Sequence, residues 1–329
     1  MPQTFPVTAA VELAVVERSG FIESRHSGSA VVLGPDGIVQ ASLGDPAAPI
    51  LPRSTLKPLQ ALACLTAGAP LDGERLGLAT ASHTGTDRHV AVVRAILEEA
   101  GVTEDDLGCP PAWPTDPATR MELARDHAAP ARVRMNCSGK HAAMLLACRA
   151  NGWDLPGYLD PAHPLQLHIR EVVERLTGEK PVTIAVDGCG APVPAVSLTG
   201  LARALHRMGG SSERSPFALH RNAAVLIGAV RAHPWTIDGP GRPDTVVLER
   251  TGVFAKTGAE GVLVMVAPDA TTVAVKVLDG SSRAASAVGL RLLERAGAVS
   301  AADAAKAVGD LSLDVHGGGA VVGAIRPTV

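Results

Sequence analysis

The order of hydrophobic patterns along the chain is the feature that most restricts its fold. Near the N-terminus two apolar runs, Ala30–Leu33 and Ile38–Leu43, flank the turn Gly34-Pro35-Asp36-Gly37, which predicts a β-hairpin. The pattern then changes to the spacing of amphipathic helices. Strand-like runs return late in the sequence and predict an antiparallel meander at Gly252–Lys256, Gly261–Val266 and Thr271–Val277.

Helical patterns fill most of the sequence between these strands. The expected helices run from a Ser54 cap to Gly68, from Thr86 to Gly101, from an Asn136 cap to Ala150, and over Pro164–Leu176, Leu198–Met208, Pro216–Ala232 and Ser281–Ala296, with a short buried strand at Val182–Val186. Strands and helices do not alternate regularly, so a doubly wound parallel sheet is disfavoured. We therefore predict an α+β fold in which both chain ends contribute to one antiparallel sheet.

The expected organisation is a single domain over residues 1–329 with two lobes. A helical region covers about residues 54–180, and a sheet region combines about residues 11–50 with 181–329. The chain is long enough for two lobes around a substantial core, because 46% of its residues are hydrophobic.

Composition excludes several classes of partner. The net charge is −3 and the aromatic residues are four Phe, three Trp and one Tyr, which disfavours nucleic-acid binding. No segment approaches the roughly 18 apolar residues that span a bilayer, so we expect no membrane partner. The N-terminal residues lack the pattern of a signal peptide, and the five cysteines are odd in number and widely spaced. We therefore expect a cytoplasmic protein with reduced thiols.

Three short segments carry groups for acyl transfer. Ser54 and Lys57 stand three residues apart and share one helix face, so a neutral lysine could take the hydroxyl proton. Lys256-Thr257-Gly258 ends an expected strand, and in penicillin-recognising acyl-serine enzymes such a strand faces a Ser-x-x-Lys helix. Ser82 lies between these motifs, where those enzymes carry Ser-x-Asn or Tyr-x-Asn, although Thr84 takes the third position here. The alternatives are a plain helix cap at Ser54 and ordinary loop residues around Ser82.

Two cysteines and a lysine form a second candidate cluster. Cys137 and Lys140 would share a helix face, and Cys189 lies in a glycine-rich turn after an expected strand. Two thiols brought together could bind Zn²⁺, but they are fewer than the four ligands usual in structural sites. The alternative is a pair of small buried side chains.

Five segments taken together resemble the bacterial L-asparaginase II family, typified by the inducible rhizobial enzyme. They are Arg53–Pro58, Ala81–Gly85, Asn136–His141, Asp187–Pro192 and Ala255–Gly261. The resemblance extends from about Val11 to the C-terminal strands. It implies a single asparaginase domain with a fold like that of serine β-lactamases, penicillin-binding proteins and glutaminases, and it implies a homodimer.

The resemblance also implies an activity and roles for particular residues. L-asparagine would be hydrolysed to L-aspartate and ammonia, with Ser54 as the nucleophile and Lys57 as its base. Ser82 and Lys256 would form a second Ser–Lys pair in the same site. Which serine is acylated stays open at this stage.

The remaining implied residues would bind zinc and substrate. Cys137, Lys140 and Cys189 would hold Zn²⁺ beside the substrate, tuning binding rather than performing the hydrolysis, and no organic cofactor is implied. Arg53, His141 and Asp187 would line the pocket or stand behind its walls. From charge alone, Arg53 is the nearest candidate for the substrate α-carboxylate, while Asp187 or Glu260 could meet the α-ammonium.

Two rival functions are compatible with the same residues. One is a related acyl-serine hydrolase, either a glutaminase or a peptidase of the penicillin-binding type; the lack of a signal peptide and Thr84 in place of asparagine count against the peptidase. The other is a non-catalytic binding protein, which an intact set of five motifs disfavours.

Overall fold

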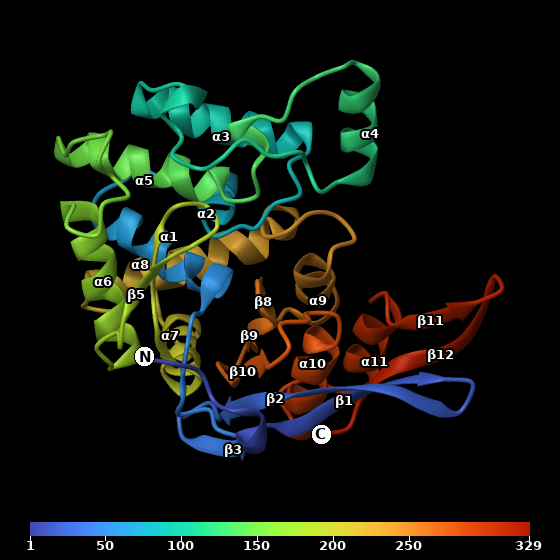
Figure 1. Ribbon diagram of the computed structural model, residues 1–329. Helices are drawn as coiled ribbons and strands as arrows, with labels where there is room; N and C mark the ends of the chain where they lie inside the picture. The colour runs from blue at the N-terminus through green and yellow to red at the C-terminus, as the bar shows by residue number, and fades with distance from the viewer.

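An antiparallel sheet of eight strands organises the molecule, and helices lie on both of its faces (Figure 1). The computed structural model describes all residues from 1 to 329. The strand order is β11-β12-β1-β2-β10-β9-β8, with β3 paired to β2. The strands are β1 Val11–Arg18, β2 Phe21–Leu33, β3 Val39–Leu43, β8 Phe254–Gly258, β9 Val262–Val266, β10 Thr272–Val277, β11 Asp314–Gly317 and β12 Ala320–Pro327. Because β12 pairs with β1, the prediction that both chain ends build one sheet is confirmed.

The long strand β2 joins the N-terminal and C-terminal parts of the sheet. Its first half pairs with β1, and its second half pairs with β3 on one side and β10 on the other. The predicted hairpin is therefore confirmed, but its first strand begins at Phe21 rather than Ala30. The predicted meander is also confirmed, with β8, β9 and β10 antiparallel in sequence order.

Eleven α-helices surround this sheet. They are α1 Lys57–Thr66, α2 Gly73–Ala79, α3 Asp87–Ala100, α4 Pro117–Arg125, α5 Ser138–Asn151, α6 Pro164–Thr177, α7 Leu198–Gly209, α8 Ala218–Ala232, α9 Pro243–Thr251, α10 Ala285–Arg295 and α11 Ala301–Gly309. Sequence patterns did not predict α2, α4, α9 or α11, which are short. No helix combines the length and the apolar character needed to cross a bilayer.

Four local predictions are wrong. Ser54 does not cap α1: it lies inside the 3₁₀ turn Arg53–Leu56, and the helix begins at Lys57. Cys137, not Asn136, is the N-cap of α5, and its side chain makes no capping hydrogen bond. The strand expected to be buried at Val182–Val186 is β5, Ile184–Val186, which is partly exposed because it pairs with β6, Pro192–Pro194, in a separate two-stranded ribbon. The last predicted helix begins at Ala285 rather than Ser281.

Alternate residues of the sheet face two separate apolar cores. On β10, Val273 and Val275 belong to the smaller core, which includes residues of α10 and α11. Ala274 faces the opposite side and belongs to the larger core formed with the other helices. Lys256 on β8 and Lys276 on β10 share the face of Ala274, so both lysines point towards the side of the larger core.

Two glycines allow the close contacts that assemble this region. A Cβ at Gly258 would lie 3.0 Å from the Pro52 carbonyl oxygen, so the turn that holds Ser54 packs directly on the end of β8. A Cβ at Gly139 would lie 2.6 Å from the Leu78 carbonyl oxygen, so the first turn of α5 packs against α2. A larger residue at either position would push two site-bearing segments apart.

Candidate active site

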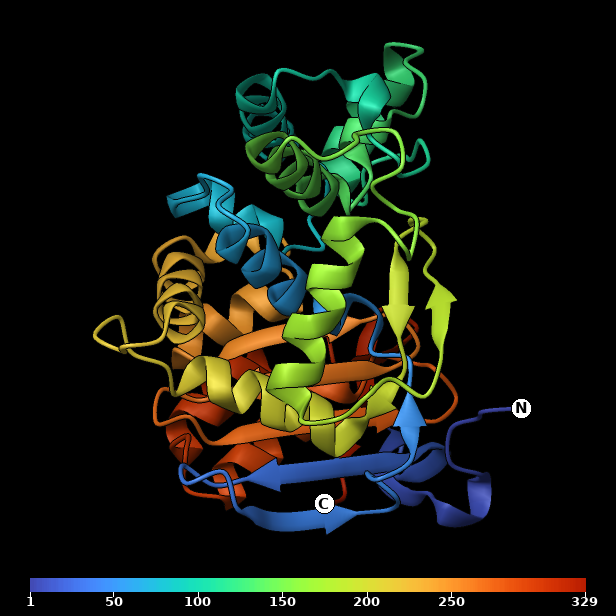
Figure 2. The same ribbon diagram turned by 90° about the vertical axis from the view of Figure 1, so that its left-hand side faces the viewer.

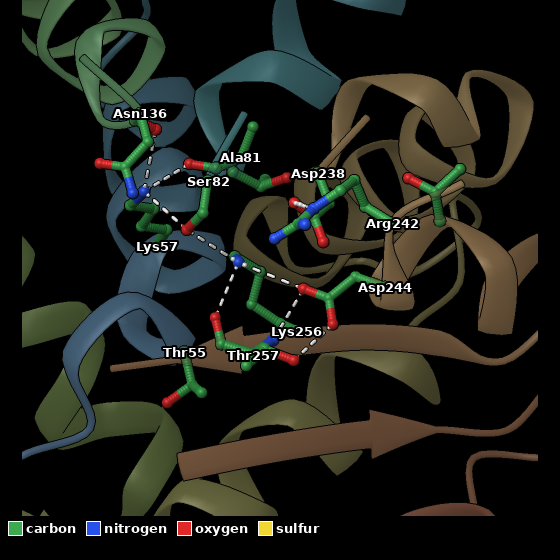
Figure 3. Close-up of polar contacts among 12 residues, drawn as sticks. Thr55, Lys57, Ala81, Ser82, Asn136, Asp238, Arg242, Asp244, Lys256 and Thr257 are labelled. Carbon is green, nitrogen blue, oxygen red and sulfur yellow. Dashed lines mark hydrogen bonds and ion pairs between the residues drawn. The ribbon is translucent and has the colours of Figure 1, made fainter. Parts of the chain in front are cut away.

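A serine hydroxyl held between two buried lysines forms the centre of the candidate site (Figure 3). Ser82 lies in the loop after α2, Lys57 opens α1, and Lys256 stands on β8. The two Nζ atoms donate to Ser82 Oγ over 2.9 Å from Lys57 and 3.0 Å from Lys256. Either amine, when neutral, could accept the hydroxyl proton from this position.

Lys57 has neutral oxygens as its other partners. The residue is 1% exposed, and Nζ also donates to the backbone carbonyls of Ala81 and Asn136. Burial lowers the pKa of Lys57 to about 8, with further lowering by the Lys256 and Lys140 charges and an opposing effect of Cys137. The amine therefore gives up its proton far more easily than an exposed lysine does.

Lys256 differs because it has a carboxylate partner. Its Nζ lies 3.5 Å from Asp244 Oδ2, and both side chains are almost completely buried. Asp244, on α9, also accepts from the Thr257 hydroxyl at 2.6 Å and from the Thr257 N–H at 2.8 Å. The sequence did not single out Asp244, and nothing in its local pattern signals this role. We call Lys57, Ser82, Lys256 and Asp244 the catalytic cluster.

A second carboxylate stands beside Asp244. Asp238 is 13% exposed, and its Oδ1 lies 3.6 Å from Arg242 Nε (Figure 3). Burial raises the pKa of Asp238 to about 6, and the neighbouring Asp244 carboxylate adds to the shift. Backbone hydrogen bonds from Ser82 N to Ile237 O and from Thr84 N to Asp238 O tie this segment to the Ser82 loop.

Ser54 lies next to this cluster but is not hydrogen-bonded to Lys57. It is half-buried in the 3₁₀ turn, three residues before Lys57. The preceding residue, Arg53, has a φ of 51°, an unusual conformation for a residue with a side chain. Such local strain is often found beside reacting groups, where the surrounding packing maintains it.

The predicted zinc residues come together close to Lys57. We call Cys137, Lys140 and Cys189 the thiol cluster; none of the three is more than 4% exposed, and Lys140 Nζ donates to Cys189 Sγ over 3.1 Å. A hydrogen bond from Cys189 holds the pKa of Cys137 well below its usual range and outweighs the opposing effect of burial. Burial lowers the pKa of Lys140, but the two thiols outweigh it and raise the pKa overall.

These donors suit zinc in kind but are few in number. No group of three or more His, Cys, Asp or Glu side chains converges anywhere in the molecule, so Lys140 would have to complete the ligand set. His141 is fully buried, and its Nδ1 lies 2.6 Å from the Tyr158 hydroxyl, which accepts from Gly108 N. When the Tyr158 hydroxyl donates to Nδ1, the ring carries its own proton on Nε2, a buried atom with no partner. In this tautomer His141 is a hydrogen-bond donor near Cys189 rather than a metal ligand.

Arg53 and Asp187 form the polar edge of the site. Arg53 Nε lies 2.7 Å from Asp187 Oδ1, and a longer contact of 3.9 Å joins Arg53 to the exposed Glu260. Burial raises the pKa of Asp187, but the Arg53 hydrogen bond and the Gly188 N–H outweigh it and lower the pKa overall. Arg53 is 23% exposed, so it stays accessible to a ligand carboxylate.

Three packed rings, those of His83, His89 and Trp235, adjoin the Ser82 loop. His83 accepts from Gly85 N at Nδ1 and donates from Nε2 to Ser138 Oγ over 2.9 Å. Its ring stacks on His89 with centroids 5.1 Å apart, and His89 in turn contacts Trp235. Ordinary loop residues around Ser82 were one interpretation of the sequence; the structure instead joins His83 to the neighbouring α3 and to Ser138, 55 residues away at the start of α5.

Comparison with known proteins gives one family. The model of a family described as L-asparaginase II matches residues 14–327. Two crystal structures of Mglu, one in its Tris and glutamate form, are 14% and 13% identical, each with a TM-score of 0.45, and the match covers 87% and 81% of this protein. It spans 62% and 66% of those two Mglu chains, less than two thirds of their length. No curated protein sequence matches.

Proposed function

Because the chain belongs to the L-asparaginase II family, we propose that it hydrolyses the side-chain amide of L-asparagine to give L-aspartate and ammonia. Family membership supports an amidohydrolase for substrates of the asparagine or glutamine kind. The observation that carries the finer proposal is the Ser82 hydroxyl held between Lys57 and Lys256, next to the strained turn that bears Ser54.

Ser54 acts as the nucleophile in this proposal, with Lys57 as its base. The Ser54 oxygen attacks the amide carbon, and its proton passes to the Lys57 amine one helical turn away. The N-terminal end of α1 lies beside the reacting centre, where its dipole favours the negative charge that develops on the carbonyl oxygen. Ser54 and Lys57 are not hydrogen-bonded without substrate, and catalytic contacts often tighten when substrate binds.

Ser82 and Lys256 deliver a proton to the leaving amine. Ser82 contacts both amines, so it can relay a proton between Lys57 and the ammonia that departs. Asp244 Oδ2 lies 3.5 Å from Lys256 Nζ and holds this amine beside the Ser82 hydroxyl. Water then hydrolyses the Ser54 ester and regenerates the hydroxyl. The motifs of Ser54, Ser82 and Lys256 follow one another in the same sequence order as the corresponding motifs of penicillin-recognising acyl-serine enzymes.

We also propose that Cys137, Lys140 and Cys189 hold Zn²⁺. When bound, the ion would supply positive charge close to the substrate. The ionised Cys137 thiol suits a metal, and Lys140 would bind after losing its proton. The unpartnered His141 Nε2–H would then stabilise the sulfur ligands by hydrogen bonding.

One observation favours a second candidate for the nucleophile. Ser82, unlike Ser54, already contacts two lysine amines. A diazoketone analogue of asparagine would label the attacking serine, and peptide mapping would locate the label. Label on the peptide that contains Ser54 supports the proposal, and label on Ser82 replaces it.

Ammonia release is the primary test of the function. We expect wild-type protein to hydrolyse asparagine with a kcat/KM about 10- to 200-fold above that for glutamine, because one extra methylene discriminates by this amount. Equal kcat/KM values would favour a glutaminase, and turnover of a chromogenic β-lactam would favour a penicillin-binding-type peptidase. Sedimentation of the same sample tests the implied homodimer.

A further inference from the structure

A fourth buried lysine lies outside the catalytic and thiol clusters. Of the six lysines, Lys57, Lys140 and Lys256 belong to those clusters, and two are exposed. Lys276 on β10 is 7% exposed, and its Nζ donates to the backbone carbonyls of Glu260 and Val277. It forms no ion pair, although buried ammonium groups usually have an anionic partner. One of its three N–H donors is left without an acceptor.

Lys276 lines a cavity of about 400 Å³, a size typical of small-molecule sites. Arg53 and Glu260 line it as well, and its apolar walls include Ile50 and Leu278. Arg53 and Lys276 therefore place two cationic side chains on the walls of one cavity.

The cavity adjoins the proposed nucleophile. Arg53, which lines it, directly precedes Ser54 in the sequence. Across the sheet, Lys276 on β10 pairs with Val262 on β9, and Val262 pairs with Gly258 on β8. Gly258 is the glycine on which the Ser54 turn packs, so Lys276 lies two strands away from that turn. The other walls come from the N-terminal segment, from β4 (Pro49–Ile50) and from the β5–β6 ribbon, which lie on one side of the molecule in Figure 2.

We propose that this cavity is a carboxylate subsite, and that it accepts asparagine substrates extended by one residue at the α-carboxyl end. The proposal rests on the proposed function, because it places the scissile amide at Ser54. With free asparagine, the α-carboxylate meets Arg53. An added residue lengthens the substrate by about 3.5 Å and carries the terminal carboxylate past Arg53 towards the free N–H of Lys276.

The reaction on the extended substrate is the same hydrolysis. The C–N bond of the asparagine amide breaks, water supplies the hydroxyl of the new carboxyl group, and ammonia leaves with the transferred proton. An asparaginyl dipeptide therefore becomes an aspartyl dipeptide with its peptide bond intact.

Three substrates test the subsite: asparagine, Asn-Ala, and Asn-Ala N-methylamide, in which the terminal carboxylate is masked. We expect kcat/KM of the wild type to be about 10- to 100-fold higher for Asn-Ala than for the N-methylamide, the effect of one hydrogen bond to a charged group. Lys276→Met should abolish this ratio and change asparagine hydrolysis less than about threefold. Lys306→Met, at an exposed lysine on α11, should preserve the ratio. A wild-type ratio near one, or a ratio that survives Lys276→Met, overturns the proposal.

Further measurements separate this proposal from the proposed function. If Asn-Ala is hydrolysed and asparagine is not, the assignment to free asparagine falls and the subsite stands. If neither is hydrolysed, calorimetry with Asp-Ala tests the subsite by itself. Binding to the wild type that is lost in Lys276→Met supports the subsite, and an absence of binding to the wild type contradicts it. Added acetate could stimulate asparagine hydrolysis in the wild type but not in Lys276→Met, while Asn-Ala is hydrolysed no faster than its N-methylamide. In that case the carboxylate belongs to a separate molecule and the extended-substrate proposal is wrong.

A second variant guards against misfolding of Lys276→Met. Lys276→Arg keeps a positive charge at this position of β10. We expect its kcat/KM ratio of Asn-Ala over the N-methylamide to stay above about threefold, with asparagine hydrolysis changed less than about threefold. A folded Lys276→Arg protein with a ratio near one would contradict a role for the charge at this position.

Discussion

The catalytic cluster and the thiol cluster each contain a lysine that is almost fully buried, yet the two pKa values shift in opposite directions. Lys57 is 1% exposed and Lys140 is 2% exposed. Burial lowers the pKa of Lys57 to about 8 and outweighs the opposing effect of Cys137; the hydrogen-bond partners of Lys57 are a hydroxyl and two carbonyls. Burial acts on Lys140 too, but the two thiols outweigh it and raise the pKa. The atoms around a buried amine, rather than burial itself, decide whether it serves as a base or as a cation.

The largest expected effect comes from removing the proposed nucleophile or its base. Ser54→Ala and Lys57→Met should each lower kcat by about 10⁴-fold or more, because a nucleophile and its base act as a unit. Steady-state ammonia release measures this, with circular dichroism to confirm folding and Lys306→Met as the control. Near-normal turnover by folded Lys57→Met protein would show that Lys57 is not the base. The proposed difference in function between Lys57 and Lys140 would then be wrong.

The buried ion pair of the catalytic cluster should control stability. Asp244→Asn keeps the shape of the side chain but leaves Lys256 buried without an anion. We expect the free energy of unfolding to fall by about 3–5 kcal/mol, as when one member of a buried pair is removed. Guanidinium denaturation measures the change, and Asp314→Asn on exposed β11 should have almost no effect. Equal stability of the two variants would show that Lys256 does not depend on Asp244.

The thiol cluster should affect substrate binding more than turnover. Cys137→Ser should reduce zinc content and raise KM for asparagine about tenfold, with kcat changed less than about threefold, since a hydroxyl replaces an ionised sulfur ligand. Metal analysis of the purified protein and the kinetics of chelated wild-type enzyme provide the measurements. Cys64→Ser, at a buried cysteine outside the cluster, should retain the zinc. Identical zinc content in both variants would exclude the cluster as the metal site.

The smallest effect concerns the carboxylate beside Asp244. Asp238 has a pKa raised to about 6, so between about pH 4 and 6 the folded protein binds more protons than the unfolded state. The contribution of Asp238 to stability therefore falls as pH rises through this window. Asp238→Asn should be more stable relative to wild type at pH 7 than at pH 4, by about 2 kcal/mol. A difference that does not depend on pH would show that Asp238 is ionised equally in both states.

Sequence patterns predicted the long elements better than the short ones. The helix from Thr86 to Gly101 has both of its ends encoded locally: Thr86 caps the His89 N–H, and Gly101 adopts a φ of 64°. In contrast, α4 contributes no buried residue and so has no apolar stripe to detect. The β5 strand was expected to be buried because its residues are apolar, but its partner is a single short strand in a separate ribbon rather than the main sheet.

The sequence by itself determined which residues could share a face over one helical turn, and it identified the family. Spacing predicted Ser54 beside Lys57 and Cys137 beside Lys140, because residues three apart lie on one side of a helical turn; in the structure Ser54 and Cys137 precede the α-helices that carry their partners. The tertiary structure alone decided that Lys57 bonds Ser82, that Lys256 meets both Ser82 and Asp244, and that Lys276 faces a cavity. The contact between Lys256 and Ser82 joins residues 174 apart, and it exists because β8, α1 and the Ser82 loop pack together. Such contacts arise from the mutual packing of whole elements, about which local sequence patterns carry no information.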